Sequence, residues 1–264
     1  MTVRPSTAVG AVLALGVAVF AALAALVAAH GWAPFGFERG TIDWVVAHRP
    51  HPAERAAELL TDLGTGVFSY LFALAAGALL VRATRPHRSR PAAVAVLLAP
   101  VAWLATGQLL RQGLMHGFGR PRPPAADWAF TAHGFAFPSG HAFTGALSAG
   151  LLALAVTLAR PGAARPAATA AAGFALLIGC TRVYLGVHWP LDVLAGWVLA
   201  AAWLALGALL FRTRLRVLRE HALRGDHAPG DHAPGDPTLR GDRPGRASAG
   251  GAPGFDLGRR ALPG

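Results

Sequence analysis

Six long apolar stretches constrain the fold of this 264-residue chain more than any other feature of its sequence. Each is close to the 20 or so residues that an α-helix needs to cross the ~30 Å hydrocarbon core of a bilayer. Ala, Leu and Val occupy all sides of the expected helices, as lipid-embedded helices require. The expected spans are 8–29, 65–82, 92–110, 142–159, 167–186 and 191–211. The sequence therefore predicts an all-α bundle of six transmembrane helices.

The composition agrees with a membrane protein and excludes several other classes. Charged residues make up 14% of the chain, whereas a soluble domain carries about 25%. The formal net charge is +11, but the arginines are scattered between apolar runs instead of covering one polar domain, so no nucleic-acid partner is expected. The single cysteine, Cys180, excludes an intramolecular disulfide and a cysteine-based zinc site.

The arginines also predict the topology. If the six spans cross the membrane in alternating directions, one side of the membrane receives Arg4 and the arginines at 82–90, at 160–165 and after 211. Positive residues favour the cytoplasmic side. Both termini are therefore expected in the cytoplasm of a multi-pass cell-membrane protein. The first span is interpreted as a retained helix, with a cleaved signal peptide as the alternative, because its apolar run exceeds the usual ~7–15 residues of a signal core.

The chain is expected to divide into a six-span membrane domain, residues 1–215, and a cytoplasmic tail, residues 216–264. The tail is basic, rich in Gly and Pro, and repeats Gly-Asp-His-Ala-Pro at 225–234. Such a composition buries too little apolar surface to fold, so the tail is predicted to be disordered.

Three polar clusters lie where spans end or begin, and polar groups at membrane depth are costly and usually functional. The first is Arg-Pro-Arg-Pro at 120–123, and the second is Pro-Ser-Gly-His at 138–141. The third comprises Thr181, Arg182, His188 and Asp192. Because successive spans alternate in direction, all three clusters are expected at the same extracytoplasmic face.

The clusters contain groups that suit an anion. Arg122 and Arg182 carry planar guanidinium forks that match phosphate oxygens. Ser139 precedes a helix and can cap its first turn, and the Gly140 backbone can approach an anion at that helix N-terminus. Taken singly, these patterns are also typical of a loop with snorkelling arginines and of an ordinary helix cap.

His188 and Asp192 lie one helical turn apart, so the carboxylate can bind one imidazole nitrogen and leave the other free. They could instead merely pair at a helix start. With His141 as an acid, the set is suited to phosphoryl transfer through a nucleophilic histidine. The sparse outer carboxylates lack metal-ligand spacing, so no metal site is predicted.

These motifs resemble those of the PAP2 (type 2 phosphatidic acid phosphatase) superfamily over roughly residues 40–211. That family carries Lys-x6-Arg-Pro, then Pro-Ser-Gly-His, then Ser-Arg-x5-His-x3-Asp. The matching residues here are Arg122-Pro123, 138–141, Arg182, His188 and Asp192, with Thr181 at the serine position. The lysine position of the first motif holds Met115, or Gly113 if the motif is aligned on Arg120. Arg111, one turn before Met115 on the same helical face, is the candidate replacement, and His116 is adjacent.

The resemblance implies a role for each residue and no cofactor. His188 would attack phosphorus and form a phosphohistidine, Asp192 would orient it, and His141 would protonate the leaving oxygen. The phosphate would be held by Arg122, Arg182, Ser139 and Gly140, with Arg120 and Arg111 as further candidates. The family works without a metal ion.

The leading functional hypothesis is an integral membrane phosphatase acting on a lipid phosphate or diphosphate at the outer face, with membrane lipids around it. Candidate substrates are phosphatidic acid, phosphatidylglycerol phosphate and polyprenyl diphosphate. Alternatives are a lipid or sugar phosphotransferase on the same site and a non-catalytic lipid-phosphate transporter. The sequence does not predict the oligomeric state.

Several other residues carry weaker expectations. Cys180 is expected to be a buried small hydrophobe. Trp189 is expected to anchor the chain at the membrane interface. The segment 41–60 has helical spacing and could lie along that interface. The loop with Asp127 and His133 is expected to be solvated, with a cover over the site as the alternative.

Overall fold

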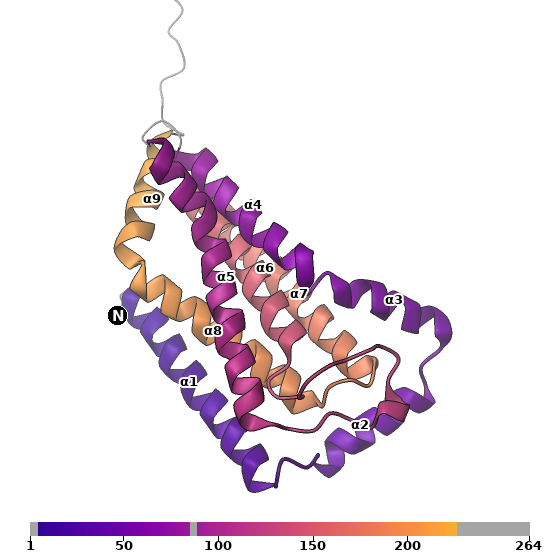
Figure 1. The fold of residues 1–264 in the computed structure, drawn as a ribbon. Coiled ribbons are helices and arrows are strands. Elements are labelled where there is room, and N and C mark those ends of the chain that lie inside the picture. Colours follow the sequence, from indigo (N-terminus) through magenta and orange to yellow (C-terminus); the bar gives the residue numbers. More distant parts are fainter. Residues whose placement is uncertain (1–4, 85–88, 226–264) are drawn as a thin grey trace, which may run out of the picture. The chain divides into compact units, whose positions relative to one another are not determined.

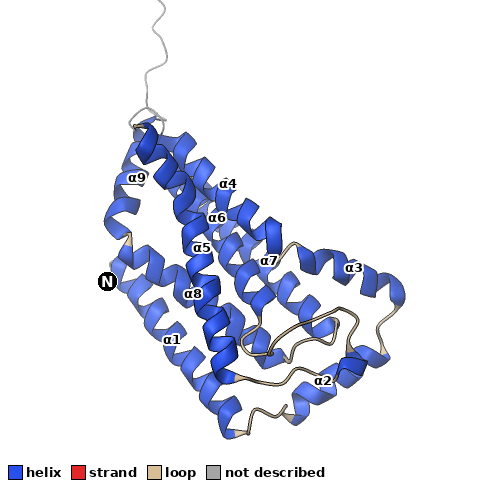
Figure 2. Ribbon diagram, viewed as in Figure 1, coloured by secondary structure: helices blue, strands red, loops and turns tan. Residues whose placement is uncertain are grey.

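A computed structural model describes residues 5–84 and 89–225, which are predominantly helical and contain no strand (Figure 1, Figure 2). The helices are α1 (Pro5–Ala29), α2 (Gly36–Ala47), α3 (His51–Asp62), α4 (Gly66–Thr84), α5 (Arg90–Phe118), α6 (Gly140–Ala159), α7 (Ala164–Tyr184), α8 (Pro190–Leu210) and α9 (Arg212–Gly225). Short 3-10 turns, η2 (Ala125–Asp127) and η3 (Pro161–Ala163), lie between them.

Six of the described segments are long and apolar enough to cross a membrane, which confirms the six predicted spans. They are Thr7–Ala29, Gly66–Thr84, Arg90–Phe118, Gly140–Ala159, Pro161–Tyr184 and Pro190–Leu210. The third is longer than the expected 92–110, because the polar stretch that follows continues the helix to Phe118. Gly119 then ends it in a left-handed conformation with φ 65°, which glycine adopts without strain.

The predicted tail is only partly described. Its first residues, 216–225, belong to helix α9, which packs against α4, α6 and α8. Leu218 on this helix is buried. The remainder of the predicted tail, from residue 226, lies outside the described residues.

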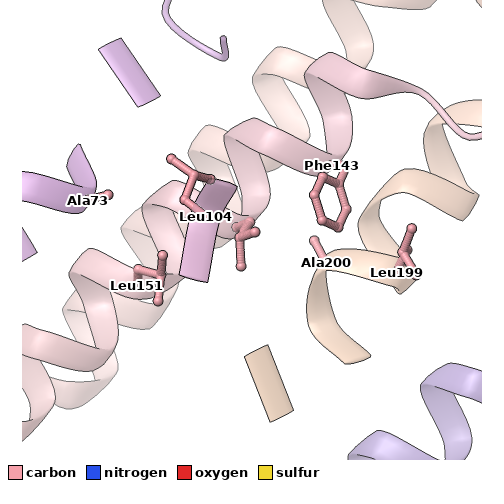
Figure 3. Packing of buried hydrophobic residues seen from close by; sticks show 7 residues of the cluster. Ala73, Leu104, Phe143, Leu151, Leu199 and Ala200 are labelled. Atoms are coloured by element: carbon pink, nitrogen blue, oxygen red, sulfur yellow. The ribbon is translucent and has the colours of Figure 1, made fainter. Parts of the chain in front are cut away.

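Helix α6 is the centre of the bundle and packs against α4, α5, α7 and α8. Around α6, helix α1 packs against α8, and α4 packs against α5. The core cluster takes small and large side chains from four helices, and Phe143 of α6 faces Ala200 of α8 (Figure 3). The cluster consists of Ala73, Leu104, Phe143, Leu147, Leu151, Leu199 and Ala200.

One close helix contact fixes the position of two predicted motifs. A Cβ on Gly196 would lie 2.8 Å from the Ser139 carbonyl oxygen and 3.0 Å from the Ala142 Cβ. Only glycine lets α8 approach the start of α6 so closely. The backbone N–H of Ser139 donates to the carbonyl of Asp192 across this contact, at 2.9 Å.

The end of α5, the start of α6, the end of α7 and the start of α8 meet at one end of the bundle, called the site end below. Helices α2 and α3 connect the site ends of α1 and α4 (Figure 1). They form where helical spacing was expected over 41–60, with Pro50 preceding the first turn of α3. The three polar clusters of the sequence therefore converge in space.

Candidate active site

A cavity of about 750 Å³ opens at the site end, lined by α4, α5, α6, α7 and the loops after α5 and α7. Its volume falls within the ~300–1,000 Å³ of typical ligand pockets. Six predicted site residues line it, namely Arg111, Arg122, Gly140, His141, Arg182 and His188. The other three predicted residues, Ser139, Arg120 and Asp192, are fully buried behind the wall.

His188 lies in the short turn between α7 and α8, and its two ring nitrogens face different groups. Nε2 is 2.9 Å from Nη1 of Arg122, and a guanidinium can only donate, so Nε2 accepts. Nδ1 therefore carries the hydrogen, on the side of the Asp192 carboxylate, whose Oδ2 is 3.6 Å away. That distance is longer than a hydrogen bond. The nitrogen that carries the lone pair is therefore Nε2, which faces Arg122, and both residues line the cavity.

The surroundings of His188 keep its imidazole neutral. Burial lowers the pKa of His188 well below its ordinary value, and the guanidiniums of Arg122 and Arg182 lower it further. An interaction with the Ala136 backbone opposes this shift without reversing it. A neutral imidazole is the form that can act as a nucleophile.

Asp192 is held by groups behind the cavity wall. Its Oδ2 accepts the Trp189 N–H at 2.8 Å, which caps the first turn of α8, and its Oδ1 accepts from Nη1 of Arg120 at 2.6 Å. Arg120 also donates to Glu38 of α2 at 2.6 Å. All three charged side chains are fully buried. Glu38 additionally accepts the N–H groups of Phe35 and Leu191.

Arg120 thus has a place different from the one predicted for it. Its guanidinium is paired with two carboxylates and does not line the cavity, so the expectation that it contacts phosphate does not fit the geometry. Burial lowers its pKa, but the charges of Asp192 and Glu38 outweigh burial and raise the pKa overall. The sequence motif could not distinguish Arg120 from Arg122, because the pairing partner lies 82 residues away in α2.

Arg122 is held by the loop carbonyls at the cavity wall. Its nitrogens donate to Gly134 at 3.0 Å, to Val187 at 2.8 Å and to His133 at 2.9 Å. No carboxylate pairs with it among the described residues. Burial lowers the pKa of Arg122 to about 10, with a further contribution from Arg111, so it stays protonated at neutral pH.

Arg182 and Arg111 are placed by uncharged partners. Arg182 is buried, donates to Thr61 of α3 at 2.9 Å and stacks over Phe130 with its Cζ 4.8 Å from the ring centroid. Arg111 on α5 donates to the Sδ of Met115 at 3.1 Å and to Gln112 at 2.5 Å.

Arg111 reaches the start of α6, where the phosphate-binding motif lies. A Cβ on Gly140 would lie only 3.3 Å from the Arg111 Cζ and Nη1. The guanidinium is therefore in contact range of the Gly140 backbone, beside the helix N-terminus that can bind an anion. The long side chain brings a cation to this wall although the family's lysine position holds Met115.

Unpartnered polar atoms are concentrated at this cavity. Seven buried side-chain nitrogens and oxygens lack a hydrogen-bond partner in the described part of the chain, and five of them belong to predicted site residues. Those five are Arg111 Nε, Ser139 Oγ, His141 Nε2, Arg182 Nε and His188 Nδ1. Buried polar groups are normally satisfied, so such a concentration indicates that the cavity is built for a polar ligand.

Some weaker expectations were wrong. The Ser139 hydroxyl does not cap α6, because the first turn is entered without a side-chain hydrogen bond. Trp189 is buried and donates to the Pro121 carbonyl, so it is not an interface anchor. Cys180 faces the outside of the helix bundle instead of the core.

The loop after α5 is packed and not simply solvated. Asp127 pairs with Arg39 of α2 at 2.9 Å, and its carbonyl accepts from Arg49. Trp128 donates to the Pro123 carbonyl at 2.9 Å, and His133 lines the cavity. The loop therefore forms one wall of the site.

Sequence reasoning missed Glu38, Thr61 and Phe130. The sequence signal for Glu38 was weak. Glu38 is the third residue of α2, and its carboxylate accepts the backbone N–H of Phe35, the residue before that helix. Thr61 and Phe130 carry no pattern that links them to Arg182. Within residues 5–84 and 89–225, no group of three His, Cys, Asp or Glu side chains is arranged to hold a metal ion.

Comparisons with known proteins add to this geometry. A family model of the PAP2 superfamily matches residues 66–216. An undecaprenyl-diphosphatase of Sulfolobus acidocaldarius is 41% identical over 69 residues, which is 25% of this chain and 29% of that relative. The crystal structure of a transmembrane PAP2-type phosphatidylglycerolphosphate phosphatase from Bacillus subtilis superposes with a TM-score of 0.64 at 24% identity, covering 76% of this chain and 96% of that chain.

Proposed function

Because this chain belongs to the PAP2 superfamily, whose model matches more than half of it, we propose that it removes phosphate from a lipid phosphate or diphosphate. The observation that carries the proposal is the cavity itself. Three arginines that form no salt bridge within the described residues line it, together with a neutral histidine whose acceptor nitrogen contacts Arg122. This arrangement stabilises the charge of a phosphoryl group beside a nucleophile.

In the first step, Nε2 of His188 attacks phosphorus and the bond to the leaving oxygen breaks. His141, which takes up a proton once the anionic phosphate is bound beside it, gives that proton to the leaving oxygen, so the lipid leaves as an alcohol or, from a diphosphate, as a lipid monophosphate. The Asp192 carboxylate orients Nδ1 and stabilises the positive charge that develops on the imidazole. Arg122 turns from His188 Nε2 toward the phosphate oxygens.

In the second step, water replaces the leaving group. Neutral His141 takes a proton from the water, the new P–O bond forms and the P–N bond breaks. Inorganic phosphate leaves, and His188 returns to its neutral form. Arg182, Arg111 and the Gly140 N–H hold the phosphate oxygens in both steps, whereas the Ser139 hydroxyl lies behind the cavity wall and is not assigned to the phosphate. We propose that no metal ion takes part.

We further propose a polyprenyl diphosphate as the first substrate to test, ahead of phosphatidic acid and phosphatidylglycerol phosphate. The local similarity to an undecaprenyl-diphosphatase supports this order.

The arginine distribution supports a site at the extracytoplasmic face with both termini in the cytoplasm. Labelling of His133→Cys in a Cys180→Ser background by an impermeant maleimide on intact cells tests the side.

Purified full-length protein in detergent tests the chemistry. We expect His188→Ala and His141→Ala to abolish or nearly abolish phosphate release, while the exposed His51→Ala leaves it unchanged. Acid quenching with labelled substrate should trap a phosphohistidine in the parent and none in His188→Ala, and EDTA should not slow the reaction. If both site variants release phosphate as fast as the parent, the proposal is wrong.

The same assay separates hydrolysis from phosphotransfer, since water and an alcohol compete for the phosphohistidine. With glycerol or a sugar added, hydrolysis predicts inorganic phosphate as the main product. A phosphorylated alcohol as the main product would favour the phosphotransferase alternative.

A further inference from the structure

A second cavity, of about 660 Å³, lies at the opposite end of the bundle from the candidate active site. It is enclosed by the last turns of α4, α6 and α8, the first half of α5, and α9. Its wall is made largely of Ala, Leu and Val side chains. The volume is in the range of ligand pockets, and the apolar wall suits a hydrocarbon chain.

Helix α9 presents an unusual face to this cavity. Arg214, Leu215, Val217 and Leu218 of α9 line it, and so does Phe211, the residue just before this helix. Arg214, Leu215 and Leu218 have the i, i+1 and i+4 spacing of one helix face. Arg214 is the only charged residue among the described residues of the wall. It therefore stands within an apolar stripe, with its exposed side chain at the cavity rim.

Further cations lie close in sequence to residues that line the cavity. Arg212 and Arg216 are exposed on α9, Arg82 is exposed in the last turn of α4, and Arg90 begins α5. The structure gives none of them a carboxylate partner within the described residues. An apolar cavity next to unpaired cations matches a molecule with a hydrocarbon chain and an anionic head.

We propose that this cavity binds an anionic phospholipid of the surrounding membrane. One acyl chain occupies the apolar space between α5, α8 and α9, and the lipid phosphate binds the Arg214 guanidinium. Arg212 and Arg216 point elsewhere around the helix, because they lie two residues to either side of Arg214, and add only general attraction. The site is separate from the reaction site and does not depend on the proposed function.

Native mass spectrometry of the purified full-length protein tests the proposal with phosphatidylglycerol and phosphatidylcholine of the same acyl chains. We expect phosphatidylglycerol to be retained more tightly and to raise the thermal unfolding temperature. Arg214→Gln should weaken its binding about tenfold or more, as the loss of one charge-assisted hydrogen bond does. The matched variant Arg216→Gln should weaken it less than about fivefold, the effect of one arginine near an anionic surface.

A second variant tests the chain pocket without changing charge. Ala99→Trp fills the cavity and should abolish retention of phosphatidylglycerol while Arg214 is intact. Far-UV circular dichroism and the elution volume verify that each variant is folded. The proposal is overturned if phosphatidylcholine binds equally well, if Arg214→Gln and Arg216→Gln weaken binding equally, or if Ala99→Trp still retains phosphatidylglycerol.

Discussion

One buried arginine and a cluster of three others lie at the same end of the bundle and have opposite surroundings. In the paired network, formed by Glu38, Arg120 and Asp192, a fully buried guanidinium lies 2.6 Å from each of two carboxylates. In the open cluster, formed by Arg111, Arg122 and Arg182, the guanidiniums contact carbonyls, a thioether, an amide, a hydroxyl and an imidazole nitrogen. No carboxylate pairs with the open cluster in the described part of the chain.

The contrast separates a structural use of arginine from a binding use. Burying a charge is costly unless an opposite charge accompanies it, and the paired network satisfies that condition within the protein. The open cluster has no such direct pairs: Asp192 acts on Arg122 and Asp62 acts on Arg182 only through longer-range attraction. An anion that enters the cavity therefore finds guanidiniums available for direct pairing. Variants should therefore lose stability in the paired network and activity in the open cluster.

Among the arginine variants, the largest effect on activity is expected for Arg182→Leu. Losing a preorganised donor to a transition-state oxygen typically lowers kcat about 10²–10³-fold. The thermal unfolding temperature should stay the same or rise, since a buried cation without a carboxylate partner disappears. Phosphate release and thermal unfolding of the same preparation measure both quantities, and a large loss of stability with unchanged turnover would contradict the comparison.

Arg120→Leu should mainly lower stability, whereas Arg182→Leu should mainly lower activity. Removing this cation leaves Glu38 and Asp192 buried without a counter-charge, which costs about 3–5 kcal/mol of unfolding free energy. The control is Arg39→Leu, which removes a partly exposed arginine that pairs with Asp43 and Asp127, where little stability is expected to change. Chemical unfolding in detergent measures both variants. Equal stability of Arg120→Leu and the parent would assign Arg120 to the open cluster instead.

The sequence predicted the spans well, because hydrophobicity and length alone decide which segments can cross a bilayer. It placed the end of the third span too early, since Arg111 and Gln112 look like a boundary on a hydropathy scale. In the structure they continue α5 and line the cavity. At residues 216–225, which composition alone assigns to the tail, the structure has the second part of α9 with Leu218 buried.

The cavity residues were predictable where motif spacing carried the information, as for His141, His188 and Arg182. The paired network was not, because Glu38 and Arg120 belong to segments 82 residues apart, and only the folded backbone brings them together. For the same reason the sequence does not predict that Arg120 forms ion pairs with two carboxylates, whereas Arg122, two residues later, lines the cavity.

Arg111→Leu is expected to have a smaller effect than Arg182→Leu. One charge-assisted hydrogen bond is worth about 1.5–3 kcal/mol, so kcat/KM should fall about tenfold to a hundredfold. Arg111→Lys should retain part of the activity as a point charge. Arg90→Leu, at the far end of the same helix, is the matched control. Unchanged kcat/KM in Arg111→Leu would show that the family's missing lysine is not replaced from this position.

The smallest effect is a shift of the pH profile in Arg122→Gln. Burial and two nearby cations hold the pKa of His188 well below its ordinary value of about 6.5, so the nucleophile stays neutral as the pH falls below that value. Removing the Arg122 charge raises this pKa toward the ordinary one. The acid limb of kcat/KM should then move to higher pH, although the variant is also slower because it has lost a phosphate ligand.

The position of that limb, and not its height, is the informative quantity. It can be measured from about pH 5 to 8, the range in which histidines titrate, with a short-chain substrate and with Arg39→Gln as the control. The same low pKa of His188 also makes folding stability depend on pH. The unfolded chain binds a proton at His188 near the ordinary pKa and the folded chain does not, so stability should fall as the pH drops below that value. Arg122→Gln should reduce this dependence, and an unmoved acid limb would mean that the Arg122 charge does not control His188.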